Sequence, residues 1–440
     1  MAQYFKIKEI GVIKKPLNTQ DQVFWYLKRD KIEPCRQNMH ADVVIVGGGM
    51  AGLAAAQAWQ KRGKKVILLE QFYCGSGASG KSSGFITPNA ELSFTDFSNR
   101  YGMQDAFKIW NFISRGVDDI RSNILDHNFD CGYQAQDTLI VASNLASMKE
   151  LKIEHDNLEK FGYQTKLYDK KMVKNKIGST SYFGGVSYEN TFGIDGYRYC
   201  QSLKKHLESL GVLIFEETPV TSIGDHVVIT PYAKISADYI VVCTDRFTPE
   251  LGLLKQEIYH AQTFVMMSQV LTDEQVALIF PDKKLMVWDT DLIYNYFRIT
   301  SDNRLLLGGG DLISTYASKA KHDYDPIVKK LTNYFSKNFP EIEIQFEQVW
   351  PGLIGISKDI APIAGSDKNK PYIYYATAAA GLPIAASMGR HSVENLIDGN
   401  KEFDVYFSPY RKFPISGFTQ SVLGNKLSFA LSNLINKNIP

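Results

Sequence analysis

The run of residues 42–70 restricts the fold more than any other part of the sequence. DVVIVGGG at 42–49 is an apolar, β-branched strand that runs into glycines. MAGLAAAQAWQKRG at 50–63 has the apolar spacing of a helix and ends in a glycine, and KKVILLE at 64–70 is a second strand that ends in an acid. This order of strand, glycine turn, helix and strand predicts a βαβ unit with parallel strands.

The glycines of this unit have the spacing of a phosphate-binding turn. Gly47, Gly49 and Gly52 fit G-x-G-x-x-G directly after the strand and at the start of the helix. Such glycines make the tight turn, admit a pyrophosphate and let the helix pack on the strand, while the helix N-terminus attracts the anion. Glu70 ends the second strand, where a carboxylate hydrogen-bonds a ribose diol. The unit predicts a bound dinucleotide without distinguishing NAD from FAD; the alternative is a glycine turn that binds nothing.

Helical and strand patterns continue along the rest of the chain. Helical spacing occurs at 103–126, 144–160, 198–211, 324–338 and 382–397, and strand patterns occur at 137–142, 235–244, 285–289, 292–300, 304–310 and 372–377. The three strands between 285 and 310 are separated by short turns and are expected to be adjacent in one sheet. An α/β start followed by antiparallel-type strands predicts two intertwined domains. The segment VFWYL at 23–27 is expected to pack against them.

The composition excludes several other classes of protein. The 440 residues suffice for about two or three domains. The 49 basic and 47 acidic side chains leave a formal charge of +2, so no global field attracts nucleic acid, and none is expected as a partner. The five scattered cysteines form no metal-binding or disulfide pattern, so we expect reduced thiols and no metal. We find neither a signal peptide nor an apolar run near the roughly 18 residues that span a bilayer, and expect a cytoplasmic protein.

The segment after Glu70 carries a second motif. GSGASGKSSGF at 75–85 resembles the GASGR-type stretch of amine-oxidising members of the D-amino-acid oxidase superfamily of FAD-dependent oxidoreductases. Further segments resemble this superfamily in the same order along the chain, at 193–220, 237–251, 293–310, 349–365 and 372–399. The resemblance covers roughly residues 40–415 and extends to bacterial amine oxidoreductases in particular.

The resemblance implies an α/β fold. It predicts a Rossmann-like FAD-binding domain of the glutathione-reductase type, interleaved with an α+β substrate domain built on an antiparallel sheet. The implied FAD-binding domain comprises 41–90, 196–255 and 348–415, and the substrate domain comprises 91–195 and 256–347. An N-terminal extension at 1–40 and a C-terminal helix at 416–440 flank these domains. We expect that helix to pack on its own domain, with a peripheral membrane contact as the alternative.

The resemblance also implies FAD as the cofactor and indicates which residues hold it. Ser79 and the stretch after it wrap the pyrophosphate, Lys81 adds positive charge, and Val220 holds the adenine through its backbone. The helix that begins after Gly381 directs its N–H groups at the flavin, where negative charge accumulates on reduction. The implied cofactor-binding residues are Gly47, Gly49, Met50, Ala51, Gly52, Glu70, Gln71, Ser79, Gly80, Lys81, Ser82, Ser83, Val220, Thr244, Gly355, Gly381, Leu382, Pro383 and Ile384.

Two departures from relatives bear on the cofactor. Relatives that attach flavin covalently use a histidine near the second motif or a cysteine in the C-terminal half. This chain has no histidine between His40 and His127 and no cysteine after Cys243, so we expect non-covalent FAD. Many relatives have Gly-His-Gly-Gly-like residues where this chain has Ala378, Ala379 and Ala380, so the turn before the last helix differs from theirs.

The resemblance predicts oxidation of a C–N bond in a small amine or amino acid by hydride transfer to flavin N5. Tyr294, Tyr296 and Arg298 alternate in a predicted strand and therefore share one face. Arg298 lies where amino-acid oxidases of this superfamily bind the substrate carboxylate; the alternative is an arginine paired with an acid, beside tyrosines that pack. Lys358 and Asp359 are expected to be solvent-exposed. Two other functions stay open: a flavin-binding assembly or regulatory protein without turnover, and an oxidoreductase that modifies tRNA.

Overall fold

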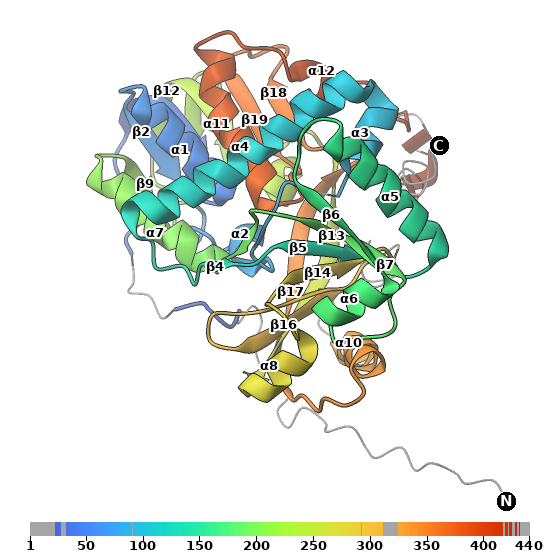
Figure 1. The fold of residues 1–440 in the computed structure, drawn as a ribbon. Coiled ribbons are helices and arrows are strands. Elements are labelled where there is room, and N and C mark those ends of the chain that lie inside the picture. The colour runs from blue at the N-terminus through green and yellow to red at the C-terminus, as the bar shows by residue number, and fades with distance from the viewer. Residues whose placement is uncertain are drawn as a thin grey trace, which may run out of the picture.

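The computed structural model contains two large sheets, one in each half of the molecule, with helices around them (Figure 1). The described residues are 23–27, 32–89, 91–291, 293–310, 324–416, 419–420, 422–424, 427–428 and 431. The predicted C-terminal helix therefore lies largely outside the described residues, as do residues 1–22 of the predicted N-terminal extension.

The first sheet has eight strands and contains the predicted βαβ unit. Its main path runs β10-β11-β12-β1-β2-β9, and β19 pairs with β12 and with β18. Strand β1 is parallel to both of its neighbours, β12 and β2. The pairs β2–β9 and β12–β19 are also parallel. The bounds are β1 Met39–Val46, β2 Val66–Leu69, β9 Leu213–Phe215, β10 Ser222–Ile223, β11 Val227–Ile229, β12 Lys234–Val242, β18 Ile363–Ser366 and β19 Ile373–Thr377. Because β1, β2, β9, β12 and β19 are parallel, their carboxyl ends lie at the same edge of the sheet, although these strands come from distant parts of the chain.

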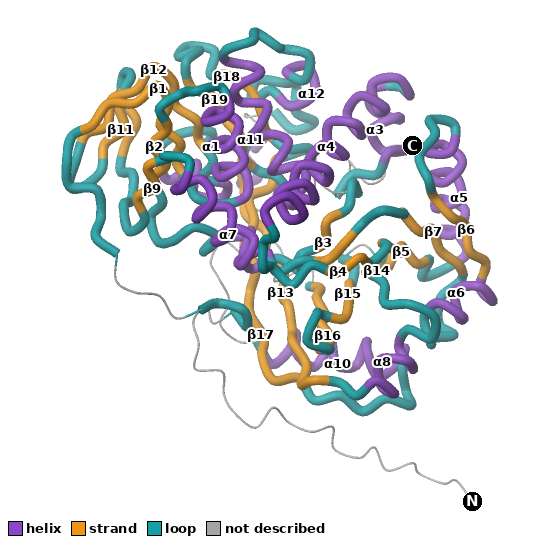
Figure 2. Tube along the Cα trace, turned by 60° about the vertical axis from the view of Figure 1, so that its left-hand side comes forward, coloured by secondary structure: helices purple, strands orange, loops and turns teal. Residues whose placement is uncertain are grey.

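Three helices stack beside this sheet (Figure 2). They are α1 (Met50–Lys61), α4 (Met103–His127) and α11 (Leu382–Leu396), each at a predicted position. They approach closely because glycines meet backbone at the crossings. A Cβ on Gly389 would stand 2.1 Å from the carbonyl oxygen of Ala51, and one on Gly116 would stand 2.0 Å from that of Pro383. Any side chain at either glycine would force the helices apart.

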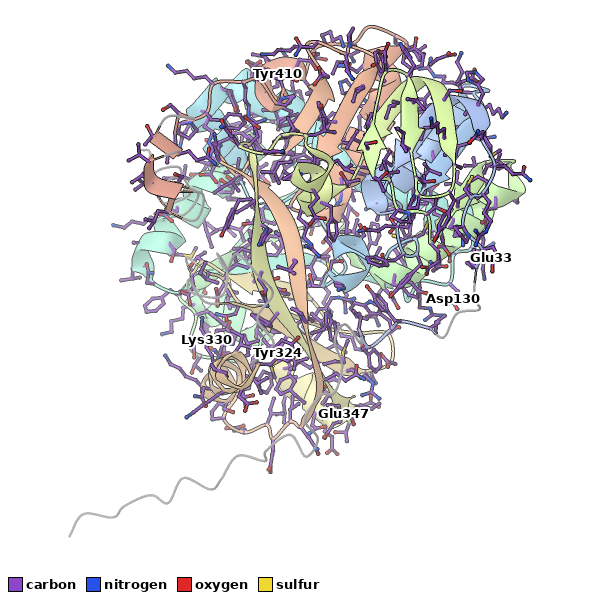
Figure 3. All side chains as sticks on the ribbon, turned by 180° about the vertical axis from the view of Figure 1, so that it is seen from behind. Glu33, Asp130, Tyr324, Lys330, Glu347 and Tyr410 are labelled. Atoms are coloured by element: carbon purple, nitrogen blue, oxygen red, sulfur yellow. The ribbon has the colours of Figure 1, made fainter. Side chains whose placement is uncertain are left out.

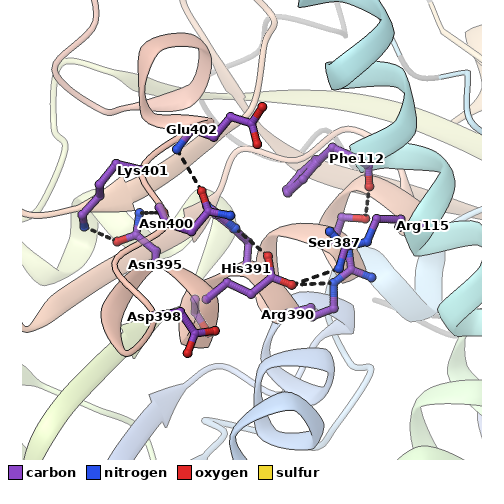
Figure 4. Close-up of polar contacts among 12 residues, drawn as sticks. Phe112, Arg115, Ser387, Arg390, His391, Asn395, Asp398, Asn400, Lys401 and Glu402 are labelled. Carbon is purple, nitrogen blue, oxygen red and sulfur yellow. Dashed lines mark hydrogen bonds and ion pairs between the residues drawn. The ribbon is translucent and has the colours of Figure 1, made fainter.

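Polar side chains also connect α4 to α11 (Figure 4). The Ser387 hydroxyl donates to the carbonyl oxygen of Phe112 at 2.5 Å. The Glu394 carboxylate accepts from Arg115 at 3.0 Å and hydrogen-bonds His391 Nδ1 at 2.9 Å. The bond with His391 lowers the pKa of Glu394 to about 2, although partial burial acts in the opposite direction. The contacts of Ser387 with Phe112 and of Glu394 with Arg115 hold α11 against α4. The family resemblance implies that the N-terminus of α11 faces the flavin.

The second sheet also has eight strands, in the order β17-β13-β16-β15-β14-β5-β7-β6. Neighbours are antiparallel except for β14 and β5. The long strands β13 and β17 run from the first half of the molecule into the second, where Glu347 marks the far end (Figure 3). The bounds are β5 Thr138–Val141, β6 Thr165–Asp169, β7 Gly184–Tyr188, β13 Ile258–Val270, β14 Met286–Asp289, β15 Tyr296–Ile299, β16 Arg304–Gly309 and β17 Phe346–Ser357.

The remaining elements connect or cover these sheets. The helices are α2 Ala78–Lys81, α3 Phe94–Tyr101, α5 Leu145–Glu159, α6 Lys170–Lys176, α7 Gly196–Ser209, the 3₁₀ helix η1 Asp245–Leu251, α8 Asp273–Ile279, α10 Asp325–Asn338 and α12 Asp404–Phe407. A third, small sheet pairs β8 (Phe192–Gly193) with β3 (Phe85–Ile86) and β4 (Gln134–Ala135). No helix within the described ranges is long and apolar enough to cross a membrane.

The fold class and most predicted elements are confirmed. The strands predicted at 285–289, 292–300 and 304–310 are the neighbours β14, β15 and β16, but β15 begins only at Tyr296, so Tyr294 lies before it. The boundaries of the two domains stay a prediction. The segment 23–27 packs as expected, with Val23 and Trp25 buried.

The predicted exposure of Lys358 and Asp359 is wrong. Their exposed fractions are 3% and 6%. The Asp359 carboxylate accepts bonds of 2.8 and 2.7 Å from the guanidinium of Arg411. Burial alone would raise the pKa of Asp359, but the charge and hydrogen bonds of Arg411 outweigh it and hold the pKa below its usual range. The sequence did not show this pair because Arg411 lies far along the chain.

Candidate functional site

A cavity of about 600 Å³ opens at the carboxyl ends of β1 and β2. Ligands of parallel sheets bind at this edge, and the volume is typical of a ligand site. The predicted cofactor residues that line it are Gly47, Gly49, Met50, Ala51, Glu70, Gln71, Ser79, Lys81, Val220 and Thr244. The predicted residues Gly52, Gly80, Ser82, Ser83, Gly355, Gly381, Leu382, Pro383 and Ile384 lie outside this lining.

The glycine turn has no room for side chains at two of its positions. Gly47 has a φ of +107°, and a Cβ there would stand 2.5 Å from the carbonyl oxygen of Cys243. A Cβ on Gly52 would stand 1.8 Å from the carbonyl oxygen of Gly47. Gly49 is the N-cap of α1 and has no side chain to cover the first N–H groups of the helix. The N–H groups of Gly47, Gly48 and Met50 are bonded to Leu69, Glu70 and Ser79. The turn therefore offers the cavity space free of side chains and the positive end of α1, which suits a pyrophosphate.

Glu70 forms the wall of the cavity at the end of β2. Its Oε2 accepts from the Gly48 N–H at 2.7 Å, and its Oε1 accepts from the Phe72 N–H at 2.9 Å. Burial raises the pKa of this carboxyl although both N–H groups lower it. Each carboxylate oxygen can accept a second bond, so Glu70 can still receive ribose hydroxyls. The cavity thus retains the acceptor that the sequence predicts.

The segment 75–84, termed the cofactor loop, forms another part of the cavity wall. The Ser79 hydroxyl oxygen accepts from the Met50 N–H at 2.9 Å, which joins α2 to the start of α1. The Ser82 hydroxyl donates to the carbonyl oxygen of Ser79 at 3.0 Å. A Cβ on Gly80 would stand 2.1 Å from the carbonyl oxygen of Gly75. The cofactor loop is therefore closely folded against the glycine turn.

Asp245 is a lining residue that the sequence analysis missed. It follows β12 with a φ of +45°, and its Oδ2 accepts from the Gly355 N–H at 2.7 Å. Burial raises the pKa of Asp245 to about 6, although bonds from the N–H groups of Gly355, Arg246 and Ala378 lower it. Asp245 thus joins β12, β17 and the turn before α11. An acid directly after a buried strand was the available signal.

The turn before α11 reaches the cavity through Ala379, and the first turn of α11 reaches it through Ala385. Ala378 is buried with a φ of +54°. Gly381 is the N-cap of α11 with a φ of +128°. The turn before α11 is therefore part of the cavity wall.

Other lining residues were not predicted either. They include Tyr26, Tyr73, Ser76, Arg246, Phe247 and Leu353. Arg246 lies over the ring of Phe247 at 3.8 Å. These side chains come from four separate parts of the chain, and their meeting depends on the fold.

The residues predicted to act on the substrate lie beyond the cofactor loop. The Tyr294 hydroxyl donates to Glu91 at 2.6 Å, and the rings of Tyr294 and Tyr296 are 5.9 Å apart. Arg298 is only 1% exposed. Its Nε donates to the carbonyl oxygen of Ser83 at 2.8 Å, and its Nη2 donates to that of Ile194 at 2.6 Å. The structure therefore brings the two tyrosines together and buries Arg298 against the end of the cofactor loop.

Burial lowers the pKa of Arg298 to about 10. Elsewhere in the described part of the chain, no group of three or more His, Cys, Asp or Glu side chains has an arrangement that could hold a metal ion.

A parallel sheet, a glycine turn at the first strand and a buried glutamate at the second define a dinucleotide-binding protein. The family follows from similarity: residues 42–394 match the DAO family, described as FAD dependent oxidoreductase, and the chain belongs to this family. The predicted class and cofactor are thereby confirmed. The residues present fit FAD, because the side-chain-free turn leaves space for its pyrophosphate and Glu70 offers acceptors to its ribose.

Individual relatives agree with this family. The chain is 28% identical over 390 residues to a probable oxidoreductase OrdL of Haemophilus influenzae, covering 85% of this chain and 86% of that one. It is 25% identical over 389 residues to gamma-glutamylputrescine oxidoreductase of Escherichia coli, covering 86% and 89%. The crystal structure of glycine oxidase from Geobacillus kaustophilus has the same fold, with a TM-score of 0.71, 18% identity and coverage of 86% and 100%.

Proposed function

We propose that this protein oxidises the C–N bond of a small amine or amino acid. FAD, when bound, would supply at flavin N5 the acceptor for the hydride that leaves the carbon bearing the nitrogen. Because the nitrogen needs a lone pair to form the C=N bond, a substrate that binds as an ammonium group gives up one proton before the hydride leaves. The proposal is supported by the names of the relatives above, which are a gamma-glutamylputrescine oxidoreductase and a glycine oxidase. The protein then has to bind the substrate beside the flavin and exclude water.

One group of side chains carries this proposal. Phe85 directly follows the cofactor loop, and its ring lies 5.8 Å from that of Trp288 and 6.0 Å from that of Tyr296. Tyr294 adjoins both Trp288, at 6.3 Å, and Tyr296, at 5.9 Å. Glu91, hydrogen-bonded to Tyr294, adds the one acid of this group, which we term the aromatic group.

The aromatic group has the chemistry that selects an amine. Ring faces attract an ammonium group through their quadrupole, by about 0.5–2 kcal/mol for each contact. The Glu91 carboxylate adds a negative charge next to those faces. We infer that the aromatic group binds the cationic end of the substrate, with Tyr294 oriented by Glu91.

The role of Arg298 is a separate proposal. Its Nε and Nη2 hold carbonyl groups, and its Nη1 is a buried nitrogen without a hydrogen-bond partner among the described residues. A substrate carboxylate would therefore be bound through Nη1 alone rather than through a fork of two donors. The bond to the Ser83 carbonyl also makes Arg298 a positioning residue for the cofactor loop.

Anaerobic mixing of the FAD-loaded protein with a panel of amines and amino acids tests the proposed reaction. We expect at least one compound to bleach the flavin absorbance, and Glu91→Gln to slow bleaching about tenfold with unchanged FAD content. Tyr334→Phe is the control, because its hydroxyl also has a buried partner, Tyr182, but lies outside the aromatic group. Flavin that stays oxidised with every compound would refute the proposal. That result would favour the alternative, a flavin-binding protein without turnover.

A further inference from the structure

A short segment before β1 lies directly on the cofactor loop. It is Val23–Leu27, termed the strap. The exposed fractions of Val23 and Trp25 are 3% and 7%, and both pack in one cluster with Trp350 of β17. Tyr26 lines the cavity itself. The strap therefore belongs to the wall of the FAD site although it precedes the FAD-binding sheet in the chain.

Two indoles hold consecutive carbonyl groups of the cofactor loop. Trp25 Nε1 donates to the carbonyl oxygen of Gly80 at 2.5 Å, and Trp350 Nε1 donates to that of Lys81 at 3.0 Å. The two rings meet edge to face, with centroids 5.3 Å apart. Carbonyl groups at the end of a short helix such as α2 have no partner within the helix, so side-chain donors are needed there. Trp25 and Trp350 supply these donors as a pair.

The next residue of the strap holds the other end of the same loop. The Tyr26 hydroxyl donates to the carbonyl oxygen of Ser76 at 2.9 Å. Its ring packs against those of Tyr73 and Tyr197, at 5.6 and 4.7 Å. Neighbouring strap residues thus bind the loop at position 76 and at position 80. Between these points lies Ser79, whose hydroxyl meets the first N–H group of α1.

The loop needs such support because of its composition. Gly75, Gly77 and Gly80 give it a large backbone freedom in the absence of contacts. A loop that is ordered before the ligand arrives binds more tightly, since the ordering cost is no longer part of binding. The strap contacts supply this order from outside the sheet, at the side of the cavity where Ser79 and Lys81 lie.

We propose that Trp25 and Tyr26 are positioning residues for FAD: the strap keeps the cofactor loop in its folded conformation at the cavity and would thereby slow release of the cofactor. This inference rests on FAD binding alone and is independent of which compound the protein oxidises. The strap contacts the backbone of the folded cofactor loop through Trp25 and Tyr26, and Tyr26 also lines the cavity.

The test compares FAD release from three variants. Trp25→Phe keeps the aromatic packing and removes the N–H donor, and Tyr26→Phe removes the hydroxyl. Trp59→Phe is the matched control, because its Nε1 also makes a buried bond, to Ser392 at 2.9 Å, between α1 and α11 and away from the loop. Release is followed by the rise of FAD fluorescence on dilution, and the melting temperature of each apoprotein is measured in parallel.

We expect Trp25→Phe and Tyr26→Phe each to speed FAD release about three- to tenfold, with apoprotein melting temperatures near that of the wild type. Trp59→Phe should lower the melting temperature without changing the release rate. The proposal is overturned if release from both strap variants matches the wild type. It is equally overturned if all three variants speed release in proportion to their loss of apoprotein stability.

Discussion

Replacement of Glu70 by glutamine tests the cofactor site most directly. Glu70 holds the Gly48 and Phe72 N–H groups with its two oxygens at 2.7 and 2.9 Å. A glutamine of the same shape keeps one acceptor and turns an NH₂ donor toward the other N–H group. A hydrogen bond to a charged group contributes about 1.5–3 kcal/mol, against about 0.5–1.5 kcal/mol for a neutral one. The variant therefore loses an acceptor for the turn and a charged acceptor for the ribose.

This loss predicts a dissociation constant for FAD about 10- to 100-fold higher, at about 1.4 kcal/mol for each factor of ten. Titration of the apoprotein with FAD, followed by quenching of flavin fluorescence, measures it. Glu216→Gln is the matched control. Glu216 is 1% exposed, accepts from the Cys74 N–H at 2.8 Å and pairs with Lys204 at 3.0 Å, but it does not line the cavity. It should retain FAD affinity, and equal losses of affinity in both variants would refute the ribose assignment.

The pH dependence of stability gives a second readout for Glu70. Burial raises the pKa of its carboxyl in the folded protein. Its contribution to stability is thus fully present below the unfolded pKa and is lost as the pH rises through the folded pKa. Glutamine does not titrate, so the free energy of unfolding of the Glu70→Gln apoprotein should improve relative to wild type as the pH rises through that window. A difference that stays constant with pH, in denaturant titrations, would contradict the burial argument.

Three further predictions follow from neighbouring positions. Gly52→Ala should abolish measurable FAD binding or weaken it at least 100-fold, because its Cβ would stand 1.8 Å from a carbonyl oxygen; Gly63→Ala, with open space around its Cβ, should retain FAD, as equilibrium titration will show. Burial raises the pKa of Asp245 to about 6, so its stabilising contribution is lost as the pH rises from about 4 to about 6. In urea unfolding, the free energy of unfolding of Asp245→Asn should therefore change by about 1–3 kcal/mol less than that of the wild type across this pH range. Arg298→Lys should raise KM for amines that carry a carboxylate about tenfold more than for amines without one; equal effects on both would leave Arg298 only its contact with the cofactor loop.

The amino-acid sequence determined the local structure of this protein to a large extent. The strand, glycine turn and helix of residues 42–63 were predictable because each depends mainly on neighbours in the chain. β-branched residues favour the strand, and alanines and leucines favour the helix. Gly47 and Gly52 stand where a Cβ would clash with a nearby carbonyl oxygen. The predicted acid at position 70 lies at the cavity for the same reason, since it ends a strand that is parallel to the first.

What the sequence left open are contacts between distant segments. Asp245 was missed because its partner Gly355 lies 110 positions along the chain. Lys358 and Asp359 read as charged surface residues, and only the fold brings Arg411 to the carboxylate. The pattern of neighbouring residues shows which face of a helix or strand a side chain occupies. The hydrogen-bond partners of a buried polar group, however, come from distant segments that only the fold brings beside it.

The cofactor site shows this division most clearly. The glycine turn and Glu70 could be read from one stretch of about 30 residues because a βαβ unit is a local structure. The strap, the alanine turn before α11 and the aromatic group at Phe85 and Trp288 come from separate stretches, and no local pattern relates them. Sequence alone therefore determined that a dinucleotide binds at the end of β1, whereas tertiary packing decided which other side chains line the cavity and which ones lie together as the aromatic group.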